Sequence, residues 1–99
     1  MKIALDYDET VTLDRGLWGA FIEIAKFRKH EVVIVTSRPP NVRGDSDFNE
    51  DIEMYAKGWG VSIVYCNGDQ KATRFKADVW IDDSPQSIPT YAQMHVEQA

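Results

Sequence analysis

Four short apolar runs divide the chain and predict four β-strands. They are Ile3 to Tyr7, Val32 to Val35, Val61 to Tyr65 and Val79 to Ile81, and three of them are rich in β-branched residues. Such residues favour extended backbone, and runs of this length between polar segments are typical of strands. The second run is apolar without alternation, so we expect a strand covered on both faces, as in a parallel sheet flanked by helices.

Residues at helical spacing fill the segments between these runs. One helix face before the second strand is predicted from five positions: Leu17, Phe21, Ile24, Ala25 and Arg28. Asp14 precedes them as an N-cap residue, whose side-chain oxygen accepts a hydrogen bond from the first turn. A second helix is predicted before the third strand, because Asp47 and Glu50 have the spacing of a capping box and Gly58 provides a stop.

The later part of the chain predicts shorter elements. Asp69 to Lys76 is a candidate short helix, Ser84-Pro85 has the pattern of an N-cap followed by proline, and Met94 to Val96 is a faint candidate for a fifth strand. The alternation of strands and helices predicts an α/β fold with right-handed crossovers. We expect one domain over residues 1–99, a three-layer, Rossmann-like open parallel sheet.

Composition and charge narrow the class of protein. The 99 residues are 43% apolar and 27% charged, which is typical of one compact globular domain. The net charge of -5 has the wrong sign for neutralising phosphate backbones, so no stable nucleic-acid complex is expected. Cys66 has no second cysteine to pair with, and no apolar run approaches the ~18 residues of a membrane span. We therefore expect a cytoplasmic protein without membrane contact, and the oligomeric state stays open.

Polar residues follow three of the predicted strands. Asp6 and Asp8 end the first strand, Thr36 the second, and Asp82-Asp83 the fourth. Because ligands of open α/β sheets bind outside the carboxyl ends of the strands, these side chains should share one site. Clustered carboxylates repel one another unless a cation lies between them, and Mg²⁺ prefers oxygen ligands together with substrate phosphate.

This pattern resembles the motifs of the haloacid-dehalogenase-like (HAD) phosphohydrolases. The resemblance is to a small member of that family without a cap domain. The family's first motif, D-x-D-x-T after an apolar strand, is matched by residues 6–10, and its second by Thr36. The acidic pair Asp82-Asp83 matches the fourth motif. The third motif is a lysine before that strand, for which Lys71 and Lys76 compete, with Lys71 preferred because it begins the predicted helix.

The resemblance implies a phosphomonoesterase that acts through an aspartyl phosphate on a phosphorylated substrate, either a small molecule or a phosphate exposed on a macromolecule. Asp6 would be the nucleophile and Asp8 the general acid and then the base. Thr36 would donate its hydroxyl to a phosphoryl oxygen, and Lys71 would neutralise charge in the transition state.

The same resemblance implies Mg²⁺ as the cofactor. Its ligands would be Asp6, the backbone carbonyl of Asp8 and one acid of the final pair, with Asp83 preferred as the direct ligand and Asp82 in support. Ser37 and Arg38 follow the second motif and are candidates for substrate binding, although an ion pair explains Arg38 equally well.

Two other classes of protein share some of these features. A response-regulator receiver domain also combines acids, a hydroxyl and a lysine on a parallel sheet, but its motifs follow another order along the chain. A catalytically silent HAD-like binding domain would keep the fold without turnover. The segment from Thr10 to Thr36 and the segment from Thr36 to Lys71 leave no room for an inserted cap domain, so we expect an open site.

Overall fold

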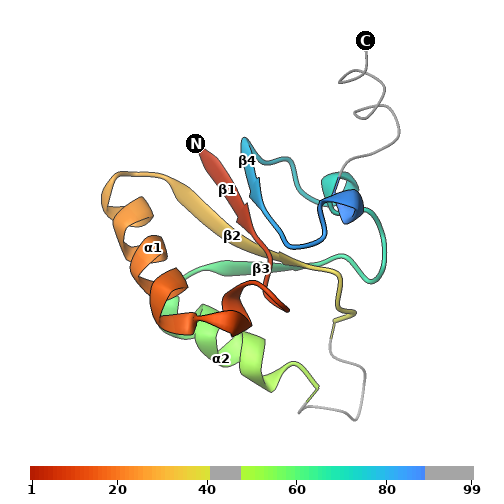
Figure 1. The fold of residues 1–99 in the computed structure, drawn as a ribbon, viewed down its shortest axis with the longest axis horizontal. Helices are drawn as coiled ribbons and strands as arrows, with labels where there is room; N and C mark the ends of the chain where they lie inside the picture. The colour runs from red at the N-terminus through yellow and green to blue at the C-terminus, as the bar shows by residue number, and fades with distance from the viewer. Residues whose placement is uncertain (41–47, 89–99) are drawn as a thin grey trace.

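The computed structural model describes residues 1–40 and 48–88, which contain a four-stranded, all-parallel sheet (Figure 1). The strands are β1 (Lys2–Leu5), β2 (Glu31–Thr36), β3 (Ser62–Tyr65) and β4 (Val79–Ile81), in the order β3-β2-β1-β4. All four predicted strands are confirmed. β1 ends at Leu5 and not at Tyr7, because the carbonyl of Tyr7 accepts the backbone N–H groups of Thr10 and Thr12 and the chain turns there.

Helix α1 (Arg15–Phe27) connects β1 to β2 and begins as predicted. The side chain of Asp14 accepts a hydrogen bond from the Leu17 backbone N–H at 3.0 Å, which satisfies a free donor of the first turn. The expected apolar face is wrong in part, since Leu17 is 57% exposed and Ile24 is 62% exposed. The buried side of α1 instead contains Ile22 and Ala25.

Helix α2 (Glu50–Trp59) connects β2 to β3, and both of its ends differ from the prediction. Its N-cap is Asn49, which makes no side-chain capping bond, while Asp47 lies outside the described residues. The helix passes through Gly58 and stops at Gly60, whose φ of 68° is the left-handed conformation that ends helices. The Lys26 ammonium also donates to the carbonyls of Trp59 and Gly60, at 2.9 and 3.2 Å, and so binds the end of α2 to α1.

The two later helices of the prediction are single 3₁₀ turns. The segment from Asp69 to Lys76 contains only η2 (Lys71–Thr73), and Pro85 begins η3 (Pro85–Ser87) without a capping bond from Ser84. A further turn, η1 (Val11–Leu13), follows β1. In η2 the backbone N–H of Ala72 donates to the carbonyl of Ile88 at 2.9 Å, so the turn is tied to a distant segment.

Both helices pack on the same face of the sheet (Figure 1). That face is formed by alternate strand residues such as Ile3, Leu5 and Ile34, which meet α1 and α2. The opposite face, with Ala4 and Val35, packs against Trp80 of β4 and against Phe75 and Ala77 of the irregular segment before β4. Within residues 1–40 and 48–88, the sheet and the two helices on its first face are as expected, and no α-helix lies on the second face.

Some expectations fall on parts of the chain outside the described residues. These are most of the loop from Pro39 to Asp45 and the candidate strand from Met94 to Val96. No helix within residues 1–40 and 48–88 has the length and apolar character needed to cross a bilayer.

Candidate functional site

The candidate site lies where β1 and β4 end side by side. β1 pairs with β2 on one side and with β4 on the other, so the sheet order changes direction at β1, which is where open α/β sheets bind ligands. A cavity of about 210 Å³ opens at this edge. Its lining includes every site residue predicted from the sequence except Arg38: Asp6, Asp8, Thr36, Ser37, Lys71, Asp82 and Asp83.

Asp6 lies at the bottom of this cavity. Its side chain is only 7% exposed, and the cavity is its route to solvent. One carboxylate oxygen accepts from the Lys71 ammonium at 2.8 Å and the other from the Thr10 hydroxyl at 3.2 Å. Burial raises the pKa of Asp6 to about 6; Lys71 opposes this rise and Asp83 adds to it.

Lys71 is the lysine of the site, while Lys76 is exposed to solvent. Its side chain is 2% exposed, and its ammonium binds Asp6 at 2.8 Å and Asp82 at 2.5 Å. Burial disfavours the charge, but the hydrogen bonds that the ammonium donates to the two carboxylates outweigh burial and hold the pKa of Lys71 above its usual value. The buried Lys71 ammonium is thus paired with two buried carboxylates, those of Asp6 and Asp82.

The acidic pair after β4 divides into a buried and an exposed residue. The side chain of Asp82 is 2% exposed, and its second oxygen accepts the Ser84 backbone N–H at 2.9 Å. Asp83 is exposed beside the cavity, and its contact with the Asp6 carboxyl raises the pKa of Asp6. Asp82 is therefore neutralised by Lys71, whereas Asp83 and Asp6 together leave negative charge facing the cavity.

The three carboxylates fit a small divalent cation. Asp6, Asp82 and Asp83 each offer one oxygen, and these oxygens lie within 4.8 Å of one another. Oxygens that share one Mg²⁺ lie at most ~4.2 Å apart, since each is ~2.1 Å from the ion. A small contraction of the three oxygens would reach that distance, and carboxylate oxygens are the donors that Mg²⁺ prefers.

Asp8 lines the cavity but is bound by Arg38. The guanidinium donates to both Asp8 oxygens, at 2.9 Å from Nε and 2.7 Å from Nη2. It also donates to both oxygens of Asp51 on α2, at 2.8 and 3.1 Å, and lies 5.2 Å from the centre of the Tyr7 ring. Arg38 is thus in the ion pair that the sequence allowed as an alternative to gripping a substrate anion.

Two hydroxyl residues complete the cavity wall at the end of β2. Thr36 is 1% exposed, and its hydroxyl oxygen accepts the backbone N–H of Arg38 at 3.2 Å. A hydroxyl that accepts one bond keeps its proton for donation, so Thr36 can donate to an anion in the cavity. Ser37 is exposed and lines the same cavity.

Sequence reasoning missed Asp51 and the two serines of the last turn. Ser84 and Ser87 line the cavity next to Asp83. The acidic first turn of α2, which includes Asp51, was visible in the sequence, but only the folded chain brings that turn next to Arg38.

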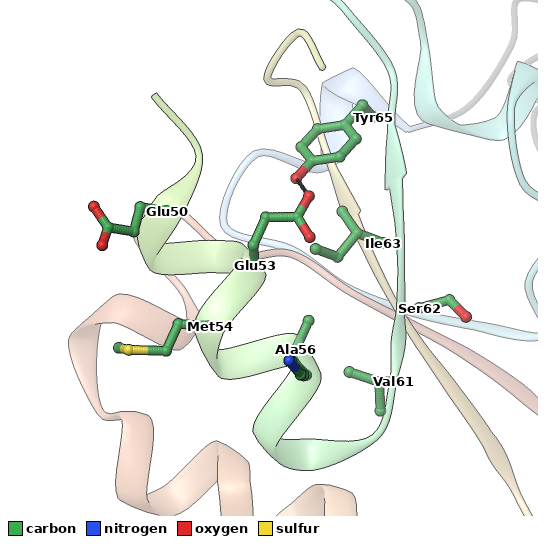
Figure 2. Close-up of a pocket in the computed structure, with 9 residues that line it drawn as sticks. Glu50, Glu53, Met54, Ala56, Val61, Ser62, Ile63 and Tyr65 are labelled. Atoms are coloured by element: carbon green, nitrogen blue, oxygen red, sulfur yellow. Dashed lines mark hydrogen bonds between the residues drawn. The ribbon is translucent and has the colours of Figure 1, made fainter. Parts of the chain in front are cut away.

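A larger cavity of about 810 Å³ lies between α2 and β3 and shares no residue with the site (Figure 2). In it the Tyr65 hydroxyl donates to the Glu53 carboxylate, and Met54 and Ile63 form part of its apolar lining. It lacks the buried lysine and paired aspartates found at the end of β1. Volume alone therefore does not identify the reactive site.

Comparisons of the chain with known protein families, with curated proteins and with solved structures find no match. The functional interpretation depends on the residues and on the geometry of the site.

Proposed function

We propose that the protein is a Mg²⁺-dependent phosphohydrolase that cleaves phosphate monoesters through an aspartyl phosphate on Asp6. The observation that carries the proposal is the buried Asp6–Lys71–Asp82 group, which faces a cavity together with Thr36 and Asp83. These residues come from four separate segments of the chain and match the order of the HAD motifs. A structural ion pair alone would not need a cavity or the additional exposed carboxylate.

The first step is attack by an Asp6 carboxylate oxygen on phosphorus. The phosphorus–oxygen bond of the ester breaks, and the leaving oxygen takes a proton from Asp8. Since the pKa of Asp6 is about 6, most of the nucleophile is ionised at neutral pH. The Lys71 ammonium and the Thr36 hydroxyl supply positive charge and a hydrogen bond to the phosphoryl oxygens.

The second step returns the enzyme to its starting state. Asp8 removes a proton from water, the water oxygen attacks phosphorus, and Asp6 leaves as a carboxylate with release of inorganic phosphate. For Asp8 to give its proton to the leaving oxygen and later take one from water, one of its oxygens must release Arg38. The Asp8 side chain is 48% exposed, which leaves room for that exchange.

Asp6, Asp83 and the backbone carbonyl of Asp8 are the residues that would hold Mg²⁺, with Asp82 fixed by Lys71 in support. When bound, the ion supplies positive charge that offsets the charge of the phosphoryl oxygens and of the two carboxylates.

The test is turnover of a generic phosphomonoester by the parent chain in Mg²⁺ and in EDTA. We expect activity in Mg²⁺ only, and its loss in Asp6→Asn, which keeps the shape of the side chain but removes the attacking charge. The matched control is Asp69→Asn, because Asp69 forms an exposed ion pair with Arg74 away from the cavity. Activity of Asp6→Asn within about tenfold of the parent would contradict the role of Asp6.

One observation favours a catalytically silent binding domain as the second candidate. Both oxygens of Asp8 are bound by Arg38, which leaves no free general acid in this conformation. Phosphate binding to a folded protein without any turnover would support this alternative.

A further inference from the structure

A second, shallower cavity of about 320 Å³ adjoins the candidate active site. It shares Glu9, Asp82 and Asp83 with the catalytic cavity. Its other walls come from η1, the beginning of α1 and the end of β4, and its apolar residues are Leu13, Leu17, Trp18 and Ile81. A substituent on a phosphate beside Asp6 would therefore enter this cavity after passing Glu9 and Asp83.

The two leucines are presented to solvent by ordered backbone. Leu13 is 73% exposed and Leu17 is 57% exposed, although each stands beside a well-anchored residue. Val11 of the same turn as Leu13 is fully buried, and the Leu13 backbone N–H donates to the Thr10 carbonyl at 3.2 Å. The Leu17 backbone N–H donates to the side chain of the Asp14 N-cap at 3.0 Å. Apolar side chains held in place next to a polar reaction centre are typical of a ligand site.

The charges around this cavity also select among leaving groups by their charge. Glu9 and Asp83 are exposed carboxylates that line both cavities. Within residues 1–40 and 48–88, the one lysine or arginine that lines either cavity is Lys71, which is buried and paired with Asp6 and Asp82. A leaving group with a second phosphate or a carboxylate would be repelled there.

We propose that this cavity binds the leaving group of the substrate, and that the preferred substrates are phosphate monoesters of uncharged apolar alcohols. The inference rests on the proposed phosphohydrolase function and adds the class of substrate to it. The phosphate occupies the cavity at Asp6, and the apolar group packs on Leu13, Leu17 and Trp18.

The test compares benzyl phosphate with glycerol 3-phosphate, because both release a primary alcohol and differ mainly in the apolar group. We expect the parent to prefer benzyl phosphate in kcat/KM by about tenfold or more. Leu13→Ser together with Leu17→Ser should remove most of this preference by raising the KM for benzyl phosphate. Ile24→Ser is the matched control, since Ile24 is 62% exposed on the same helix and lines neither cavity.

Three results would overturn the proposal. An unchanged preference in the double variant, with turnover retained, refutes the apolar subsite but leaves the phosphohydrolase function intact. A large fall in the melting temperature of the double variant, but not of Ile24→Ser, would show that the leucines are packed within the protein. Absence of turnover with both esters refutes the proposed function and this inference with it.

Discussion

Replacing Lys71 by methionine tests whether the ammonium holds the site together. Methionine has a similar length and fills the space, but it removes the ammonium that binds both Asp6 and Asp82. The side chains of these two carboxylates are 7% and 2% exposed, so solvent replaces the lost partner only in part. The variant leaves two buried carboxyl groups without their shared donor.

The expected loss of stability is large. Removing one partner of a buried ion pair costs about 3–5 kcal/mol, because the remaining charge is uncompensated. Since about 1 kcal/mol shifts the melting temperature of a domain of this size by ~4–8 °C, Lys71→Met should melt at least ~12 °C below the parent. The loss should shrink near pH 5, where the unpaired carboxyl groups take up protons.

The assay is urea denaturation and thermal melting, in EDTA, near pH 8 and near pH 5. Arg74→Met is the control, because Arg74 forms an exposed ion pair with Asp69, and exposed pairs contribute little. A Lys71→Met variant as stable as the parent near pH 8 would refute the arrangement. An equal loss in Arg74→Met would show that the burial of Lys71 is not the cause.

Three other predictions concern the metal, α2 and Arg38. Because burial raises the pKa of Asp6 to about 6, the native state binds more protons than the unfolded state between about pH 4 and pH 6, so stability in EDTA should fall by ~3 kcal/mol as pH rises through that window. Millimolar Mg²⁺ should restore stability mainly above pH 6, and Asp83→Ala should abolish this stabilisation by Mg²⁺. Equal melting curves with and without Mg²⁺ would contradict the metal site. Gly58→Ala should raise the unfolding free energy by about 0.5–1 kcal/mol, since Gly58 lies inside α2 with open space around its Cα; a loss of stability in urea would mean that the helix ends at Gly58. Asp51→Asn should lower kcat by several-fold and change the pH profile of kcat, with little change in KM. The reason is that Arg38 would lose one of the two carboxylates that fix it beside Asp8. A pH profile identical to that of the parent would count against this positioning role.

The strands and the site residues were predictable because their signals are local. An apolar run predicts a strand wherever it falls, and the acids that follow β1 and β4 meet because parallel strands end at the same edge. The preference for Lys71 over Lys76 agrees with the burial of Lys71 among the acids.

The parts that sequence reasoning missed depend on tertiary contacts. The backbone N–H of Ala72 in η2 donates to the carbonyl of Ile88, a contact that no local propensity reveals. The buried side of α1 includes Ile22 and leaves Leu17 exposed, since the position of the sheet decides which face of an apolar helix is covered. Asp51 reaches Arg38 only after α2 has packed on the sheet.

Direct detection of the phosphorylated aspartate tests the central claim. An Asp8→Asn variant should still be phosphorylated by an ester with a good leaving group, but it lacks the base that hydrolyses the intermediate. Acid quenching, borohydride reduction and peptide mapping should then find the modification on the peptide that contains Asp6, only when Mg²⁺ is present. Turnover by the parent with no modification in the variant, or modification at another residue, would contradict Asp6 as the nucleophile.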